Sequence, residues 1–269
     1  MSLPVSAVVP CYRSAATVER AVQSVAAQSA RPLELILVDD GSGDGTLDKL
    51  HELRARLGED WVRVVALGTN RGPSAARNAG WDAARGRYVA FLDADDTWHP
   101  RKLELQHAFM EAHPQIALSG HRHATGRHPE LPPEAPAWRT VTFRQLLVRN
   151  LIVVPSVMVR REVAARFREG QRHMEDHLLF LQLAARGEGL ALLEAPLAAL
   201  YKPQMGASGL SGQLLAMERG ELSNYRLLFR EGWIGAPALL ALWGWSLVKF
   251  ARRLAIVALR RISGSRSTA

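Results

Sequence analysis

Three aspartates lie close together directly after an apolar segment of the chain. Residues 88–92 read as a buried strand, and Asp93, Asp95 and Asp96 follow at once. Carboxylates at the mouth of an apolar strand repel one another and lose hydration. A divalent cation, Mg²⁺ or Mn²⁺, would relieve both costs, because such hard cations take carboxylate oxygens and also bridge phosphates. The alternative is a solvated, aspartate-rich turn that begins the next helix.

Segments typical of strands and helices alternate over the first hundred residues. Apolar runs predict strands at residues 5–10, 33–38, 62–67 and 88–92, and helical spacing or capping signals predict helices at 15–28, 46–57 and from Pro73 onward. Strands that alternate with helices of ten to fourteen residues indicate βαβ units. The sequence therefore predicts an α/β fold with a mostly parallel central sheet and flanking helices.

Polar residues follow three of these strands, at the sheet edge where ligands bind in such folds. Tyr12 can stack on a base, a carboxylate at Asp39 or Asp40 can accept a hydrogen bond from an imide N–H, and the Asp93/Asp95 pair can hold a cation against a diphosphate. Together these features describe a nucleoside diphosphate. Neither a P-loop nor a Rossmann glycine pattern follows the first strand.

Four motifs resemble bacterial-type glycosyltransferase family 2. They occur in family order at residues 5–12, 37–42, 70–80 and 91–96. The resemblance implies the GT-A fold of nucleotide-diphospho-sugar transferases, a metal cofactor and transfer with inversion. It also implies that Asp40, with Asp39 beside it, reads the base and that Tyr12 flanks the base; we expect Pro10 to belong to the same substrate-binding site.

The same resemblance suggests roles for three further residues. Asp95 matches a metal ligand, and Asp93 matches a residue that contacts the ribose or the metal shell. Arg77 belongs to the third motif. It would lie near the diphosphate or form a structural ion pair with an aspartate, and both interpretations stay open here.

The middle of the chain carries weaker signals. Residues 121–138 contain four prolines and three histidines without an apolar period, which predicts a loop over the site. We expect His121 and His123 to be solvent-exposed loop residues rather than metal ligands. Apolar residues at 151–159 and 190–197 predict later strands of the sheet on the acceptor side.

Glu175 and Asp176 stand at the start of a predicted apolar helix. Carboxylates at that position could simply interact favourably with the helix dipole. Glycosyl transfer, however, needs a base, because an acceptor hydroxyl has a very high pKa. By its resemblance to the family, Asp176 matches this catalytic base, with Glu175 as an orienting neighbour.

Residues 201–212 read as a loop rich in Gly and Ser, for which we expect a lid that orders on donor binding. Many family members carry a histidine near this point that contacts the metal or the diphosphate, and this chain has none there. Lys202 or Ser211 could substitute for it.

Composition and charge restrict the partners. The net charge is +8, and ten of the Lys and Arg residues, against three Glu, lie from Lys202 onward. A basic excess confined to the tail argues against a nucleic-acid partner and favours an anionic membrane surface. Cys11 is the only cysteine, and the first residues show no signal peptide, so we expect a reducing, cytoplasmic location.

The tail predicts a helix that lies on a membrane. Residues 232–248 are uncharged and include three tryptophans. Basic residues follow them, of which Lys249, Arg252, Arg253 and Arg260 share one helix side. An amphipathic helix at the inner face of the cytoplasmic membrane fits this pattern better than a bilayer span. The alternative is a helix packed on protein.

The sequence thus predicts a catalytic domain at residues 1–212, with a nucleotide-sugar half (1–100) and an acceptor half (101–212), and a helical extension at 213–269. We expect an inverting, metal-dependent glycosyltransferase that moves a sugar from a UDP-sugar to a surface-glycan or lipid-linked acceptor, in polysaccharide biosynthesis. A catalytically silent nucleotide-sugar-binding protein at the membrane and a sugar nucleotidyltransferase are the alternatives.

Overall fold

The computed structural model describes residues 2–130, 135–201 and 214–265, with side chains described up to residue 254. Residues 1–202 and 203–269 form two compact units, which we describe separately. The sequence had placed the domain boundary ten residues later, between residues 212 and 213.

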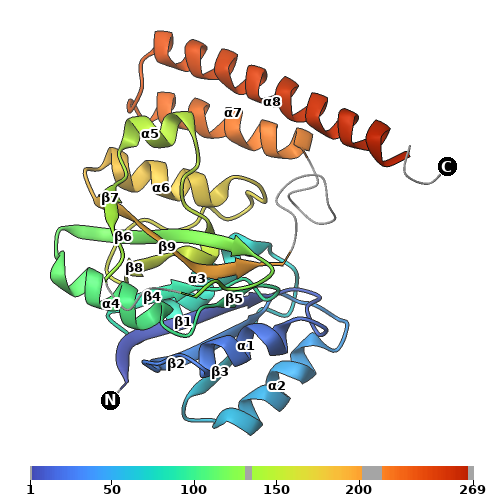
Figure 1. Cartoon of the computed structure of the whole chain (residues 1–269), viewed down its shortest axis with the longest axis vertical. Helices are drawn as coiled ribbons and strands as arrows, with labels where there is room; N and C mark the ends of the chain where they lie inside the picture. The colour runs from blue at the N-terminus through green and yellow to red at the C-terminus, as the bar shows by residue number, and fades with distance from the viewer. Residues whose placement is uncertain (1, 131–134, 202–213, 266–269) are drawn as a thin grey trace. The chain divides into compact units, whose positions relative to one another are not determined.

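The first unit is built on one mixed sheet with helices on both faces (Figure 1). The strands are β1 Leu3–Cys11, β2 Pro32–Asp39, β3 Val62–Ala66, β4 Tyr88–Phe91, β5 Thr97–Trp98, β6 Ile116–Thr125, β7 Trp138–Thr140, β8 Met158–Arg160 and β9 Gly189–Leu200. The helices are α1 Val18–Ala26, α2 Thr46–Leu57, α3 Pro73–Ala83, α4 Lys102–Ala112, α5 Phe143–Val148 and α6 Glu175–Ala185, with a 3₁₀ turn η1 at Val154–Ser156.

The sheet order is β3-β2-β1-β4-β8-β6-β9-β5, and β7 pairs with β9. The first four strands in this order are all parallel. Beyond them β8 runs antiparallel to both β4 and β6, while β6 and β9 are again parallel. The α/β class and the flanking helices predicted from the sequence are therefore confirmed.

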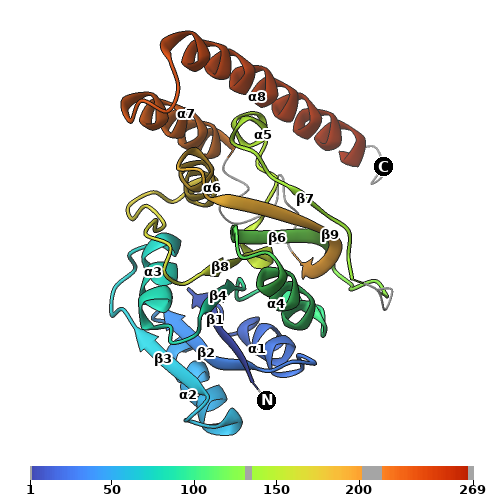
Figure 2. The same ribbon diagram turned by 90° about the vertical axis from the view of Figure 1, so that its left-hand side faces the viewer.

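Alternation along β1 explains why the sheet is covered on both faces. Val5, Ala7 and Val9 join the core that also contains the inward residues of α1. Val8 points to the opposite face, where it meets Gly80 of α3. Figure 2 shows α1 and α3 on opposite sides of the sheet. A strand that is buried on both faces needs a continuous run of apolar residues. Residues 5–9 form such a run, with Ser6 as the exception.

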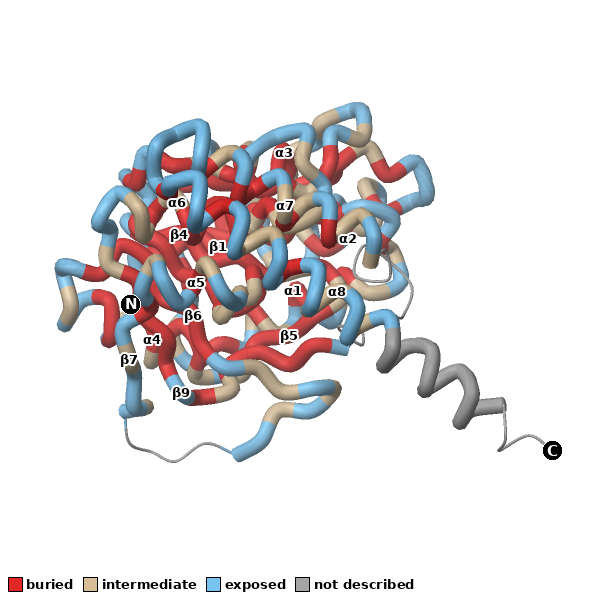
Figure 3. The backbone as a smooth tube through the Cα atoms, turned by 90° about the horizontal axis from the view of Figure 1, so that it is seen from above, coloured by how far each residue is buried: buried red, intermediate tan, exposed pale blue. Residues whose placement is uncertain are grey.

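Burial is concentrated on the sheet. In Figure 3 the strands run as buried segments through the middle of the first unit, and exposed segments surround them. The edge at which β1, β2 and β4 end is therefore held by a rigid scaffold, which suits a site that must place several side chains accurately.

The prediction of a loop from residue 121 was wrong for its first five residues. Residues 121–125 belong to β6, where His121 is paired with Leu193 of β9. His121 is 1% exposed, and its Nδ1 lies 2.7 Å from the carbonyl oxygen of Arg122. The apolar strand β9 supplies the ladder partner, so tertiary pairing outweighs the polar local sequence. His121 is thus not a solvent-exposed loop histidine.

The second unit contains α7 Leu214–Arg230 and α8 Ala236–Ser265, which pack on each other through buried polar contacts. Ser246 donates to Glu218 over 2.7 Å, and Glu221 accepts from Tyr225 over 2.8 Å and also pairs with Lys249. Among the described helices, none combines the length and the apolarity that a bilayer span requires.

This packing corrects one part of the sequence interpretation. Lys249 and Arg253, which we had assigned to a basic face for headgroups, instead interact with Glu221 of α7. A buried carboxylate needs a cationic partner, and these two residues provide it. The outward residues of α8 are largely apolar, among them Leu240, Leu247, Val248 and Leu254.

Candidate active site

The carboxyl ends of β1 and β2 lie side by side, which brings together the residues expected to bind the base. The backbone N–H of Asp40 donates to the carbonyl of Cys11 over 2.8 Å, so Tyr12 and Asp40 continue from neighbouring strands. Tyr12 is 44% exposed, and its ring is accessible for stacking. Pro10 lies two residues earlier, at the end of β1, and is half-buried.

The two aspartates after β2 have different surroundings. Asp39 accepts from the hydroxyl of Ser42 at 2.5 Å and from its backbone N–H at 3.3 Å. Asp40 accepts at 2.8 Å from both the Asn70 side chain and the Arg71 N–H, and at 2.9 Å from the Gly72 N–H. Burial raises the pKa of Asp40, and the hydrogen bonds from Arg71 and Gly72 oppose that rise. The carboxylate of Asp40 therefore holds the turn that leads into α3.

The loop after β4 carries the acidic cluster. Arg20 donates to the carbonyl of Asp95 over 2.6 Å and stacks on the ring of Tyr201 at 3.7 Å. The N–H of Tyr201, just after β9, donates to Asp96 over 3.2 Å. These contacts tie the loop to the end of β9, so its position depends on residues a hundred positions away in sequence.

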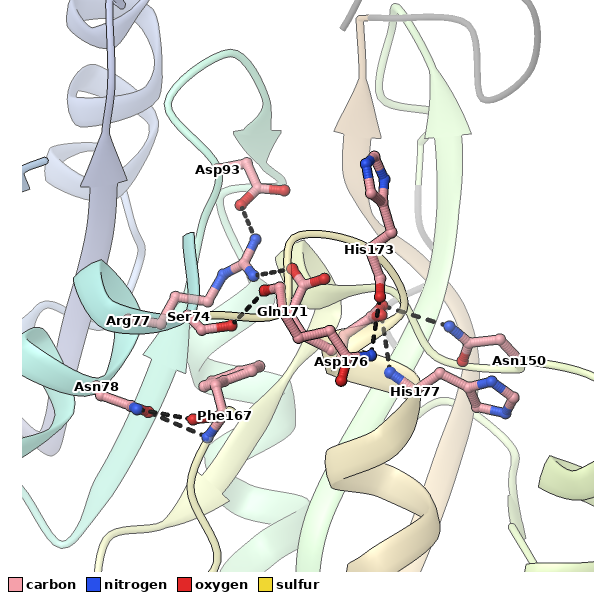
Figure 4. Close-up of polar contacts among 11 residues, drawn as sticks. Ser74, Arg77, Asn78, Asp93, Asn150, Phe167, Gln171, His173, Asp176 and His177 are labelled. Atoms are coloured by element: carbon pink, nitrogen blue, oxygen red, sulfur yellow. Dashed lines mark hydrogen bonds and ion pairs between the residues drawn. The ribbon is translucent and has the colours of Figure 1, made fainter. Parts of the chain in front are cut away.

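Arg77 connects this loop to the second half of the first unit. One nitrogen of its guanidinium lies 3.1 Å from Asp93, and the other lies 2.9 Å from Glu175. Figure 4 shows the Arg77 side chain pointing toward Asp93. Burial alone would lower the pKa of Arg77, but the charges of Asp93, Glu175 and Asp176 outweigh that effect and raise it. The ion pair with an aspartate, one of the two interpretations left open by the sequence, is present.

Asp176 lies in the first turn of α6 beside Glu175. It accepts from the Asn150 side chain over 3.3 Å and from the His177 N–H over 2.7 Å, as Figure 4 shows. Burial raises the pKa of Asp176, against the hydrogen bond from His177 and the charge of Arg77. A carboxylate with a raised pKa is a better proton acceptor near neutral pH than an ordinary aspartate.

Backbone strain marks both ends of this site. Within the described residues, Arg13 and Met174 are the two non-glycine residues with a positive φ, of 49° and 60°. Arg13 follows Tyr12, and Met174 immediately precedes Glu175. A left-handed conformation costs a non-glycine residue about 1–2 kcal/mol. Such strain persists only where the surroundings hold it, and it is often found at functional sites.

The third sequence motif positions the segment that leads into α6. The Asn78 side chain donates to the Phe167 carbonyl over 2.8 Å and accepts from its N–H over 3.0 Å (Figure 4). Ser74 donates to the carbonyl of Gln171 over 3.2 Å. Side chains of helix α3 therefore hold the 167–171 segment through backbone groups of Phe167 and Gln171.

Asp93 and Asp95 are suitable ligands for a divalent cation. Burial raises the pKa of Asp93, and the charge of Asp95 adds to the rise while Arg77 opposes it. This excess of negative charge is what a cation relieves. In the part of the chain whose side chains are described, no three His, Cys, Asp or Glu residues form a metal site by themselves. A cation here would take its remaining ligands from diphosphate oxygens and water, as Mg²⁺ commonly does.

Two residues of this site were missed in the sequence, and one group of expectations lies outside the structure. Asn150 sits in a stretch without a motif, and Arg20 reads as an ordinary outward helix residue, so neither gave a signal. The lid expected at residues 201–212, with Lys202 and Ser211, falls outside the described residues except for Tyr201.

Comparison with known proteins places the chain in a family. The model of glycosyl transferase family 2 matches residues 6–168. The putative teichuronic acid biosynthesis glycosyltransferase TuaG of Bacillus subtilis is 34% identical over 68% of this chain and 73% of its own length. A glucosyltransferase of Escherichia coli, WfgD, named for UDP-Glc and α-D-GlcNAc-diphosphoundecaprenol, is 28% identical over 66% of this chain and 69% of its own length.

Another relative is longer than this chain. The succinoglycan biosynthesis protein ExoO of Rhizobium meliloti is 48% identical, but the match spans 37% of this chain and only 27% of ExoO. The match to ExoO is therefore confined to 99 residues.

Solved structures share the fold. TarS of S. aureus in complex with UDP-GlcNAc has a TM-score of 0.67 at 20% identity, over 94% of this chain and 72% of TarS. The mannosyltransferase PcManGT of Pyrobaculum calidifontis, in complex with GDP-Man and Mn²⁺, has a TM-score of 0.67 at 19% identity, over 96% of this chain and 76% of that protein. The fold is that of the GT-A glycosyltransferases. With the family match over residues 6–168, the chain belongs to glycosyl transferase family 2.

Proposed function

We propose that this protein is an inverting, metal-dependent glycosyltransferase that moves a sugar from a UDP-sugar to a hydroxyl of a surface-glycan or lipid-linked acceptor. The names of TuaG and WfgD support an acceptor of this kind, and TarS has been solved with UDP-GlcNAc. The donor base remains a proposal, since PcManGT holds GDP-Man.

The observation that carries the proposal is the position of Arg77. Its guanidinium joins Asp93, in the loop expected to hold the metal and diphosphate, to Glu175, next to the expected base. One planar group thus links the two carboxylate sites, so leaving group and acceptor would meet within one small volume. Bringing reactants together in this way supplies much of an enzyme's rate enhancement.

Asp176 acts as the base in this proposal. Its carboxylate takes the proton of the acceptor hydroxyl while that oxygen attacks the anomeric carbon, on the side opposite the departing diphosphate. The bond between the anomeric carbon and the diphosphate oxygen breaks as the new C–O bond forms, which inverts the configuration at the anomeric carbon. Asn150 and the His177 N–H hold the carboxylate in place. Glu175 keeps Arg77 in its orientation.

Asp95 and Asp93 would hold the Mg²⁺ or Mn²⁺. The bound cation would act as a Lewis acid that stabilises the charge on the departing diphosphate. Asp93 also pairs with Arg77, so we assign the larger share of metal binding to Asp95. Tyr12 and Pro10 would flank the base. Asp39 is then the better candidate for base recognition, because Asp40 already accepts three hydrogen bonds from residues 70–72.

The described C-terminal helices would form a peripheral membrane contact at the inner face of the cytoplasmic membrane. We propose residues 1–212 as the catalytic domain and 213–269 as this extension. The exposed apolar side chains of α8 support such a contact, because large apolar patches are uncommon on surfaces that meet only water.

Calorimetric titration of UDP with and without Mn²⁺ tests the donor site. Wild-type protein should bind UDP more tightly with the metal, and Asp95→Asn should lose that gain while Asp60→Asn, an exposed carboxylate outside the site, keeps it. UDP-, GDP- and dTDP-sugars screened for metal-dependent hydrolysis would then identify the base. Metal-dependent UDP binding without hydrolysis or transfer would instead favour a silent binding protein.

A further inference from the structure

An open groove of about 390 Å³ lies on the first unit between β7 and α5. Its lining combines three arginines with an amide and two aliphatic side chains: Arg139, Arg144, Arg149, Gln145, Val148 and Leu151. The size is within the range of sites for small molecules. The accessible lining is mostly apolar, and three arginines contribute to it, a combination that suits a ligand with a hydrocarbon part next to an anionic head.

The groove has more positive charge than its neighbours neutralise. Glu194 interacts with Arg139 at 3.0 Å, but it is shared with Arg122 at 2.7 Å. Arg144 and Arg149 form no ion pair within the described part of the chain, and both are exposed. Guanidinium groups bind phosphate through paired, charge-assisted hydrogen bonds, which makes a phosphorylated ligand the best match.

Gln145 adds a further donor. Its side-chain oxygen accepts from the N–H of Thr142 over 2.9 Å, and the Thr142 hydroxyl accepts from the N–H of Gln145 over 3.3 Å. This reciprocal cap fixes the amide and occupies its only acceptor. The polar side chains of the groove therefore offer donors, which again suits an oxyanion.

One residue, Asn150, relates the groove segment to the expected base. Asn150 stands between the groove residues Arg149 and Leu151 in sequence, and its amide donates to Asp176 over 3.3 Å. The Asn150 oxygen accepts from the Ile152 N–H over 3.3 Å, which holds this segment in place. A ligand in the groove would thus lie against the segment whose Asn150 side chain contacts Asp176.

From this placement we propose that the groove binds the diphosphate of a lipid-linked acceptor, with the arginines on the phosphates and the first part of the lipid over Val148 and Leu151. This inference rests on the proposed function and names the substrate class for its acceptor side. The bound diphosphate would anchor the acceptor so that its sugar hydroxyl reaches Asp176.

Binding of farnesyl diphosphate, inorganic diphosphate and farnesol to the full-length protein tests the proposal. The titrations contain EDTA, so that the metal site does not hold the diphosphate, and they are repeated with UDP present. Farnesyl diphosphate should bind the wild-type protein more tightly than either of the other two probes. Arg144→Gln/Arg149→Gln should weaken that binding at least about tenfold, since hydrogen bonds to charged groups are worth more than a tenfold change each.

Arg186→Gln provides the matched control, because Arg186 is exposed at the end of α6 and outside the groove. It should bind farnesyl diphosphate as the wild type does, and circular dichroism verifies the fold of every variant. Unchanged affinity in the double variant would overturn the proposal. Equal affinity for inorganic diphosphate, or for farnesol, would also overturn it, since the lipid or the phosphate would then contribute nothing. Failure of the proposed function would be seen separately, as absent UDP binding with Mn²⁺.

Discussion

At the scale of single residues, three carboxylates share one guanidinium. Asp93 and Glu175 contact Arg77, and Asp176 contributes to its electrostatic surroundings. Burial raises the pKa of all three carboxyl groups, with Arg77 opposing it. The uncompensated negative charge is unfavourable for the fold alone, and perturbed carboxyl groups of this kind are common at functional sites.

We predict that Asp176→Asn separates activity from stability. Transfer should fall by a factor of about 10² or more, the scale of general-base catalysis. The thermal midpoint at neutral pH should stay the same or rise. The pKa of Asp176 is higher in the folded protein than its ordinary value of 3.8, so the protonated carboxyl group favours the folded state. This stabilisation is fully present below pH 3.8 and is lost as the pH rises through the folded pKa. At neutral pH the ionised Asp176 therefore disfavours folding. Transfer kinetics and thermal melts measure the two effects.

Asp60→Asn should change neither quantity. Normal turnover by Asp176→Asn would show that another group takes the proton. For the wild type, the acidic limb of the transfer rate should lie above the ordinary aspartate pKa of about 3.9, because the base must be ionised.

Lys102 is a second buried charge, and the proposed chemistry does not use it. It is fully buried, and its Nζ has no hydrogen-bond partner among the described residues. The amine lies 3.9 Å from the centre of the Trp98 ring. One aromatic face offsets only part of a buried cation's lost hydration, so burial lowers the pKa of Lys102 well below 10.5.

We predict that Lys102→Met stabilises the protein by about 1–3 kcal/mol at neutral pH, the cost of an unsatisfied buried polar group. Between the lowered pKa of the folded Lys102 and 10.5, the unfolded lysine is protonated while protonation of the folded lysine is unfavourable. The free energy of unfolding of the wild type should therefore rise with pH over this range. The gain from the substitution should shrink as pH approaches 10.5. Urea unfolding at several pH values measures this. Lys49→Met, which removes an ion pair with Glu19, should give no gain at any pH.

The proximity of individual candidate residues was predictable where a motif carried them. Asp93, Arg77 and Asp176 follow from family motifs, and the structure brings the two aspartates close to the Arg77 guanidinium. Asn150 was not predictable, because an asparagine in an unmarked loop has no spacing that relates it to a helix 26 residues later. Such a contact depends on tertiary placement alone.

At the scale of elements, helix α3 positions the site because it packs closely on the sheet. A methyl group on Gly80 would overlap the side chain of Val8 and come within 3.2 Å of Val38. The glycine thus lets the helix backbone approach β1 and β2. The same helix carries Ser74, Arg77 and Asn78 toward the segment before α6.

We predict that Gly80→Ala costs about 1–3 kcal/mol of stability, the usual penalty for overpacking a core. It should also reduce transfer, because a displaced α3 moves Arg77. Adding Val8→Ala should recover part of both losses by making room for the methyl group. Gly244→Ala is the control: it is also a helical glycine, but nothing lies within 4 Å of its added methyl group, so it should not destabilise. Denaturant unfolding and transfer rates test the set, and a stable Gly80→Ala would contradict the close packing.

The elements that the sequence predicted correctly have a common character. The strands expected at 33–38 and 88–92 are β2 and β4; residues 35–38 of β2 and the whole of β4 are buried on both faces and continuously apolar. The two-residue strand β5 and the three-residue strand β7 are too short for a period to be recognised. Strand β6, Ile116–Thr125, was not predicted at all, and its residues from His121 onward are polar and are paired with β9.

At the scale of the whole molecule, the second unit separates its polar and apolar residues. Glu218 and Glu221 are buried and bind Ser246, Lys249 and Arg253, so the polar groups stabilise the helix pair. The exposed residues of α8 include Leu240 at 66%, Val248 at 60% and Leu247 at 54% exposure. A membrane contact by this helix would therefore depend on apolar insertion more than on the charges of Lys249 and Arg253.

We predict that Leu247→Glu/Val248→Glu releases the protein from vesicles of anionic and zwitterionic lipid. Placing two carboxylates where aliphatic side chains would insert should weaken binding at least about tenfold, since burying each aliphatic side chain contributes about 1.5–3 kcal/mol. Sedimentation with vesicles measures the bound fraction. Wild-type binding should persist when salt is raised, because apolar insertion is not screened while headgroup attraction is.

Lys249→Gln distinguishes this mechanism from an electrostatic one. It removes the partner of Glu221, so it should lower the melting temperature of the helix pair. If apolar residues anchor the helix, Lys249→Gln should leave vesicle binding nearly unchanged. The binding is measured well below the melting temperature of the variant. If Lys249→Gln abolished binding while Leu247→Glu/Val248→Glu retained it, the anchor would be electrostatic. If both variants sedimented as the wild type does, α8 would not be the membrane contact, and its apolar side chains would have to pack on protein instead.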